Sequence, residues 1–109
     1  MSTFDDREKA FERKFEHDQE LQFKANARRN KLLGLWAAGL MGKTGDEAES
    51  YAREIVAADF EKPGHDDVIE RLVKDFAAAG TPTEARKIAK QSELLLTEAR
   101  RQIMTELKS

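Results

Sequence analysis

Aromatic side chains form a narrow stripe along the first residues of the chain. At 100° per residue, Phe4, Phe11 and Phe15 lie within about 40° of one another on a helix. The same line continues onto polar side chains, among them Asp18 and Arg29. The apolar stripe therefore stops after Phe15.

The stripe resumes at Leu33, Trp36 and Leu40, within the apolar run LLGLWAAGL. The first forty residues thus hold two amphipathic parts on what is predicted to be one continuous helix. The second part has the composition of a core helix. The first, aromatic part lies apart from the core-forming residues, which indicates a surface offered to a partner.

Helix-breaking and helix-capping residues divide the chain into four predicted helices, at approximately 19–42, 45–61, 66–79 and 82–107. Gly42 ends the first helix, and residues 44–47 (TGDE) form a capping box for the second. Pro63 and Gly64 break the chain before the third. Residues 81–84 (TPTE) supply a threonine cap, a proline at the first helical position and a glutamate at the third.

The expected core positions repeat at helical spacing within each segment after the first. They are Ala48, Tyr51, Ala52, Ile55, Val56 and Phe60; then Val68, Ile69, Leu72, Val73 and Phe76; then Ala85, Ile88, Ala89, Leu95, Leu96, Ala99, Ile103 and Leu107. No segment alternates with the period of a strand. The sequence predicts an all-α protein with a four-helix, bundle-like domain at 19–109 and a separate amphipathic segment at 1–18.

Length and composition fit one small helical domain. The chain has 109 residues, 37% of them charged, and no cysteine, which excludes disulfides and thiolate chemistry. Residues 1–20 lack the apolar stretch of a signal peptide, and no run approaches the ~18 apolar residues of a membrane span. We expect a protein of a reducing compartment, most simply the cytoplasm.

The net charge of −2 conceals an uneven distribution. Residues 21–45 carry five basic side chains and no acidic one, whereas residues 46–70 carry nine acidic and two basic side chains. Segments of opposite sign attract each other within a helical domain, which is one interpretation. The other is that residues 24–31 form a basic docking patch for an acidic surface. The two interpretations are compatible.

The sequence gives no support for an enzyme or a metal site. Gly42-Lys43-Thr44 resembles the end of a phosphate-binding loop, but Ala37 stands where that motif needs a glycine. His17 and His65 are the only histidines and lie in different segments, too few for a metal centre. His17 is a candidate pH reporter.

The free energies involved argue against firm packing of the aromatic segment on the rest of the chain. Burial of three phenylalanine side chains contributes roughly 5–8 kcal/mol. Ordering about fifteen residues costs on the order of 15–25 kcal/mol before hydrogen bonds are credited. We expect a segment that is partly disordered in the free protein and folds in a partner's groove.

Two long strings resemble one protein family. They are TFDDREKAFE at residues 3–12 and ARRNKLLGLWAA at residues 27–38. Both resemble the ζ subunit of alphaproteobacterial F-type ATP synthases, and the resemblance continues through residues 51–52, 58–60, 63–64 and 75–80. It covers nearly the whole chain, with the last helix as its least distinctive part.

The resemblance implies a non-enzymatic inhibitor of ATP hydrolysis by the catalytic head of the synthase, with no cofactor. The segment at 1–18 is expected to insert at a catalytic interface between α and β subunits, beside the γ rotor. The residues implied are the anchors Phe4, Phe11 and Phe15 and the polar contacts Asp5, Arg7, Glu8 and Lys14. From their charge we add Lys24, Arg28 and Arg29 as possible docking residues. We expect a monomer that reaches the inner membrane only through the synthase and does not insert into it.

One competing hypothesis remains at this point. A helical adaptor or nucleic-acid-binding protein would use the basic residues 24–31 to neutralise phosphates. Four basic side chains on a net-acidic domain are weak evidence for it, and steeply salt-dependent binding to DNA or RNA would be its signature.

Overall fold

The computed structural model describes residues 13, 15, 17–61 and 64–108. Four helices make up this part of the chain: α2 (Gln19–Leu40), α3 (Gly45–Glu61), α4 (His65–Ala78) and α5 (Ala85–Lys108). They pack into one globule, so the prediction of an all-α, four-helix protein is confirmed.

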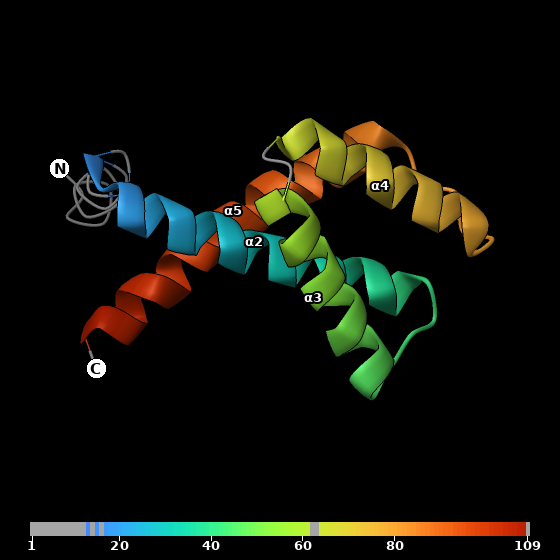
Figure 1. Cartoon of the computed structure of the whole chain (residues 1–109), viewed down its shortest axis with the longest axis horizontal. Helices are drawn as coiled ribbons and strands as arrows, with labels where there is room; N and C mark the ends of the chain where they lie inside the picture. Colours follow the sequence, from blue (N-terminus) through green and yellow to red (C-terminus); the bar gives the residue numbers. More distant parts are fainter. Residues whose placement is uncertain (1–12, 14, 16, 62–63, 109) are drawn as a thin grey trace, which may run out of the picture.

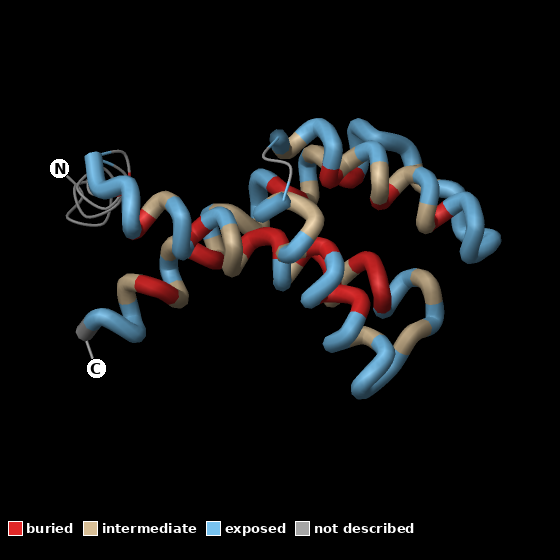
Figure 2. The backbone as a smooth tube through the Cα atoms, viewed as in Figure 1, coloured by how far each residue is buried: buried red, intermediate tan, exposed pale blue. Residues whose placement is uncertain are grey.

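The two long helices, α2 and α5, run in opposite directions, and the other two flank them (Figure 1). Helix α3 packs against α2, and α4 packs against α5 and α3. The start of α2 and the end of α5 lie at the same end of the molecule (Figure 1). Buried positions follow the whole length of α2, whereas on the other helices they occupy the inner face (Figure 2).

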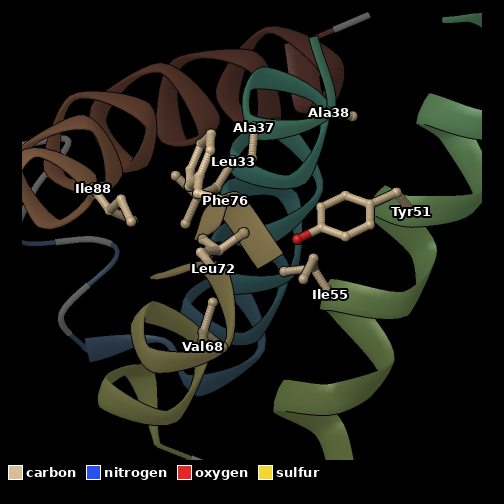
Figure 3. Close-up of a cluster of buried hydrophobic side chains, with 9 residues drawn as sticks. All are labelled: Leu33, Ala37, Ala38, Tyr51, Ile55, Val68, Leu72, Phe76 and Ile88. Carbon is tan, nitrogen blue, oxygen red and sulfur yellow. The ribbon is translucent and has the colours of Figure 1, made fainter. Parts of the chain in front are cut away.

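The main hydrophobic cluster lies where all four helices meet. Leu33 and Ala37 of α2 face Leu72 and Phe76 of α4, with Ile88 of α5 beside them (Figure 3). Trp36 packs edge-on against Phe76, with ring centroids 5.8 Å apart. Burial of these large side chains supplies the main favourable term in folding.

Helices α3 and α4 are also joined by a polar contact at the edge of this cluster. The Tyr51 hydroxyl donates to Oδ2 of Asp75 at 2.6 Å, and Arg71 pairs with the same carboxylate. Burial and the neighbouring carboxylate raise the pKa of Tyr51. The aromatic ring is thus anchored at both ends, by apolar contacts and by a hydrogen bond.

Helices α2 and α3 approach very closely at Gly34. A Cβ atom placed on Gly34 would lie 2.8 Å from Cα of Ala52, which is closer than real carbon contacts allow. Both residues are buried. The small side chains at these two positions set the distance between the helices.

The observed helix ends match several sequence signals and differ at others. Gly42 ends α2 with a φ of 83°, and the amide of Lys43 donates to the Ala38 carbonyl at 2.8 Å, as expected for a glycine C-cap. Helix α5 begins at Ala85, so the prediction that Pro82 is its first helical residue is wrong. The amides of Lys87 and Ile88 instead donate to the carbonyl of Glu84, three residues farther along than expected for the cap.

Three of the expected core positions are exposed. Ala85 is exposed at the start of α5, and the other two are large side chains. Phe60 near the end of α3 is 67% exposed and Leu107 near the end of α5 is 51% exposed. Helical spacing placed Phe60 and Leu107 on the apolar face of their helices, but both lie near a helix end, and the contact of Phe60 with Phe23 of α2 leaves most of its ring exposed. They contribute to a surface considered below.

The close approach at Gly34 leads to a stability prediction. Gly34→Ala should lower the free energy of unfolding by about 1–3 kcal/mol, because the added methyl group forces α2 and α3 apart. Gly39→Ala in the same helix is the matched control, since a Cβ there meets nothing within 4 Å. It should raise stability by up to about 1 kcal/mol through helix propensity. Urea denaturation of both variants measures the difference, and equal effects would contradict this account.

Candidate functional site

The aromatic stripe of the sequence enters the fold at Phe15. This side chain is fully buried in a second hydrophobic cluster with Leu21, Ala25 and Ile103. The guanidinium group of Arg100 lies over its ring, 5.7 Å from the centroid, which is within cation–π range. Phe15 was expected to face a partner, and in the structure it belongs to the chain's own core.

The energetic argument for weak packing failed at Phe15 because it treated the three phenylalanines as one unit. The start of α2 and the end of α5 leave an apolar space that one aromatic ring fills. Leu96 and Met104 of α5 also pack against this cluster. Burial of one ring requires few additional residues to be ordered.

A helix boundary separates Phe15 from α2. Asp18 is the N-cap of α2, with extended backbone angles (φ −108°, ψ 104°), and its carboxylate accepts from the amides of Glu20 and Leu21 at 3.0 and 3.2 Å. Such a cap satisfies amides that a continuous helix would bond internally. The prediction of one unbroken helix across residue 18 is therefore wrong, whereas the apolar stripe does stop there.

The remaining residues assigned to partner binding lie outside the described part of the chain. They are Phe4, Asp5, Arg7, Glu8, Phe11 and Lys14. Their assignment stays a prediction.

Of the three candidate docking residues, Arg28 and Arg29 form contacts within the fold and Lys24 is exposed. Arg28 donates to Oε1 of Gln102 and to Oε1 of Glu106, both at 2.8 Å, and so joins α2 to α5. The hydrogen bond with Glu106 raises the pKa of Arg28. Lys24 is exposed and pairs with Glu20 on its own helix at 3.4 Å.

Arg29 is buried, with 9% of its surface exposed. Its Nε donates to Oδ1 of Asn30, and the Asn30 amide donates to Oδ2 of Asp59 on α3 at 2.8 Å. Burial lowers the pKa of Arg29, and the negative charge of Asp59 opposes this shift. Arg29 therefore offers little exposed charge to a docking patch, and attraction between oppositely charged segments within the domain explains this part of the pattern.

A half-buried histidine at the start of α4 adjoins the same region. The ring Nε2 of His65 lies 2.6 Å from Oγ of Ser92 on α5, and Nδ1 is buried without a hydrogen-bond partner among the described residues. Burial lowers the pKa of His65, the charge of Arg29 lowers it further, and Asp59 and Asp66 act in the opposite direction. The neutral imidazole is thus favoured at this position.

The described residues contain no group of three potential metal ligands from histidine, aspartate or glutamate side chains. None of the helices in this part of the chain is long and apolar enough to cross a membrane. What the geometry offers is a rigid helical body and one point, at Phe15, where the aromatic segment joins it.

Comparison with known proteins identifies the family. The family model described as ATPase inhibitor subunit zeta matches residues 1–102. The chain belongs to this family. A solution NMR structure similar to it has 45% sequence identity and a TM-score of 0.69, covering 79% of this chain and 98% of that one. No curated protein matches significantly.

Membership of the zeta family makes this chain a non-catalytic regulatory protein whose partner is an F-type ATP synthase. The match includes both the aromatic segment and the helical body. The internal roles of Phe15 and Arg29 were missed from the sequence. A signal for Arg29 was present, because residues 21, 25, 29, 33 and 37 form a single ridge at four-residue spacing.

The position of Phe15 predicts a large effect on stability. Phe15→Ala should lower the free energy of unfolding by about 3–5 kcal/mol, because it leaves a cavity between α2 and α5. Leu94→Ala in α5 is the matched control, since Leu94 is 59% exposed and should change stability by less than about 1 kcal/mol. Chemical denaturation compares the two. A similar small loss in both variants would show that Phe15 is not a core residue in solution.

The lowered pKa of His65 predicts a stability that falls with acidity. Below the ordinary value of 6.5 the unfolded state binds a proton that the folded state still refuses, so the free energy of unfolding declines until pH reaches the folded-state pKa. Urea denaturation between about pH 7.5 and about pH 5.5 measures this slope. His65→Gln should flatten it. An unchanged slope in His65→Gln would contradict the assignment.

Proposed function

We propose that the chain inhibits ATP hydrolysis by the catalytic head of an F-type ATP synthase, with the segment N-terminal to Phe15 as its inhibitory part. The observation that supports this most strongly is the family match, which begins at residue 1 and so includes this segment. The residues assigned to partner contact are the anchors Phe4 and Phe11 and the polar residues Asp5, Arg7, Glu8 and Lys14.

The proposed mechanism is a wedge at a catalytic interface between α and β subunits, against the γ rotor. Hydrolysis requires this interface to open and close as the rotor turns. An amphipathic helix held there by aromatic anchors prevents the closure that the next turn needs. Rotation in the direction of synthesis opens the interface and expels the wedge, which makes inhibition directional.

The helical body contributes a fixed point for this segment. Phe15 is locked among α2 and α5 side chains, and Asp18 starts a separate helix three residues later. A short tether to a folded body keeps the segment at a high effective concentration once the body is near the synthase. In this arrangement Phe15 acts as the anchor of the segment on its own protein, and the partner contacts fall to the residues before it.

The basic residues have a smaller part in partner binding than their charge indicates. Arg29 is buried and Arg28 holds Glu106 and Gln102, which leaves Lys24 as the candidate docking residue with the most exposed charge. The same geometry removes charges that the nucleic-acid alternative requires. The protein is proposed to act as a monomer, bound to the synthase in the cytoplasm beside the inner membrane.

Truncation before Arg13 tests the function and its segment together. A chain lacking residues 1–12 keeps Phe15 and should keep the four-helix fold but lose inhibition of ATP hydrolysis by the isolated cognate head. Full-length protein should inhibit in the same assay. Inhibition that survives the truncation would assign the activity to the body.

Single substitutions separate binding from folding within this experiment. Phe11→Ala should raise the half-inhibitory concentration at least about tenfold, in line with the loss of an aromatic anchor from an interface. It should change the unfolding midpoint much less than Phe15→Ala, which removes a fully buried core side chain. Full inhibition by Phe11→Ala would remove Phe11 from the set of anchors.

A further inference from the structure

A wide hollow on the described surface lies beside the point where the aromatic segment enters the fold. It is a groove of about 820 Å³ lined by α2, α3 and the end of α5. We call it the Phe60 groove. Its apolar side chains include Phe23, Phe60 and Leu107, which are 55%, 67% and 51% exposed.

Two aromatic rings in this groove are fixed against each other and remain exposed. The rings of Phe23 and Phe60 pack edge-to-face with centroids 5.5 Å apart, which fixes one against the other while leaving most of each exposed. Two exposed phenylalanines and a leucine in one hollow exceed the scattered single apolar residues of an ordinary surface. Such a surface is typical of a groove that receives an amphipathic helix.

We propose that residues 1–12 of the same chain occupy the Phe60 groove when the protein is not bound to its target, so that the inhibitory segment is held against its own body. The consequence for inhibition rests on the proposed function, whereas the contact itself does not.

Proximity favours this occupant over a separate molecule. Ile103 belongs to the cluster that buries Phe15, and Ile103 also lines the groove. Twelve residues span about 18 Å as a helix and up to about 40 Å when extended, ample to reach a surface that adjoins their attachment point. A tether of this length gives the segment an effective concentration that a second molecule does not match.

Composition favours the same occupant. Phe4 and Phe11 lie on one helical line and supply two rings for a groove that exposes two. Residues 1–12 carry four acidic and two basic side chains. The groove lining carries four basic side chains, among them Lys31 and Arg53, and three acidic ones, so its net charge is of the opposite sign.

The contact is tested first in the free protein. The chain has no cysteine, so Ser2→Cys gives one unique site for a nitroxide label. Paramagnetic broadening of amide NMR signals should be strong at Phe23 and Phe60 and weak at Leu94, which is exposed elsewhere on α5. Phe60→Ala should reduce the broadening at Phe23, and Leu94→Ala should leave it unchanged. Absence of broadening at the groove would overturn the proposal.

A mixed sample separates this occupant from a second copy. Spin-labelled protein without isotope is combined with isotope-labelled protein without a spin label. The proposal predicts no broadening of the groove signals in this mixture. Broadening as strong as in the singly labelled chain would assign the groove to an interface between two molecules and overturn the proposal.

Inhibition then reports the consequence. A segment that occupies the groove is available to the synthase only in the fraction of molecules in which it is released, and the apparent affinity for the synthase is reduced by that fraction. Phe60→Ala should therefore decrease the half-inhibitory concentration about two- to fivefold, and Leu94→Ala should leave it unchanged. An increase with Phe60→Ala would mean that the groove contacts the synthase instead, and would overturn the proposal. If the wild-type chain did not inhibit at all, the proposed function would fail while the broadening result stood.

Discussion

The architecture depends on how the fold accommodates the charge of Arg29 in its interior. Transfer of a guanidinium group from water into a protein is costly unless its charge and hydrogen-bonding groups find partners. Asp59 of α3 supplies the opposite charge, and Asn30 links the two by accepting from Arg29 and donating to Asp59. This arrangement fixes the position of α3 on α2 more specifically than apolar contact does, because displacement of either helix would leave a buried charge without its partner.

The same charge limits what neighbouring groups can do. His65 at the start of α4 and Arg100 on α5 both lie within the electrostatic influence of Arg29, so a further positive charge on His65 is disfavoured. The neutral form of the imidazole is favoured, and its Nε2 lies 2.6 Å from Oγ of Ser92 on α5. The buried charge of Arg29 thus interacts with groups on α3, α4 and α5. It lies along α2 between the main cluster and the cluster around Phe15.

Sequence patterns predicted what depends on local geometry and missed what depends on distant partners. The four helices and the glycine ending at Gly42 follow from spacing and backbone preference within a few residues. Arg29 appeared to interrupt an apolar stripe because its partner Asp59 lies thirty residues away. The burial of Phe15 by α5 and the exposure of Phe60 also depend on residues distant in the sequence, and neither was predicted. The sequence therefore did not show which of the candidate site residues belong to the chain's own fold.

That division gives the aromatic stripe two different tasks. A segment that inhibits by insertion must leave its own protein without unfolding it, which requires a firm boundary between the part that moves and the part that stays. Burial of Phe15 supplies the fixed end, and the cap at Asp18 makes α2 independent of the residues before it, because its first amides are satisfied locally. Without that cap, residues 13–17 and α2 would share one continuous set of helical hydrogen bonds, and insertion into a partner would strain the body. The interruption of the apolar stripe at residue 18 is therefore a requirement of the proposed mechanism.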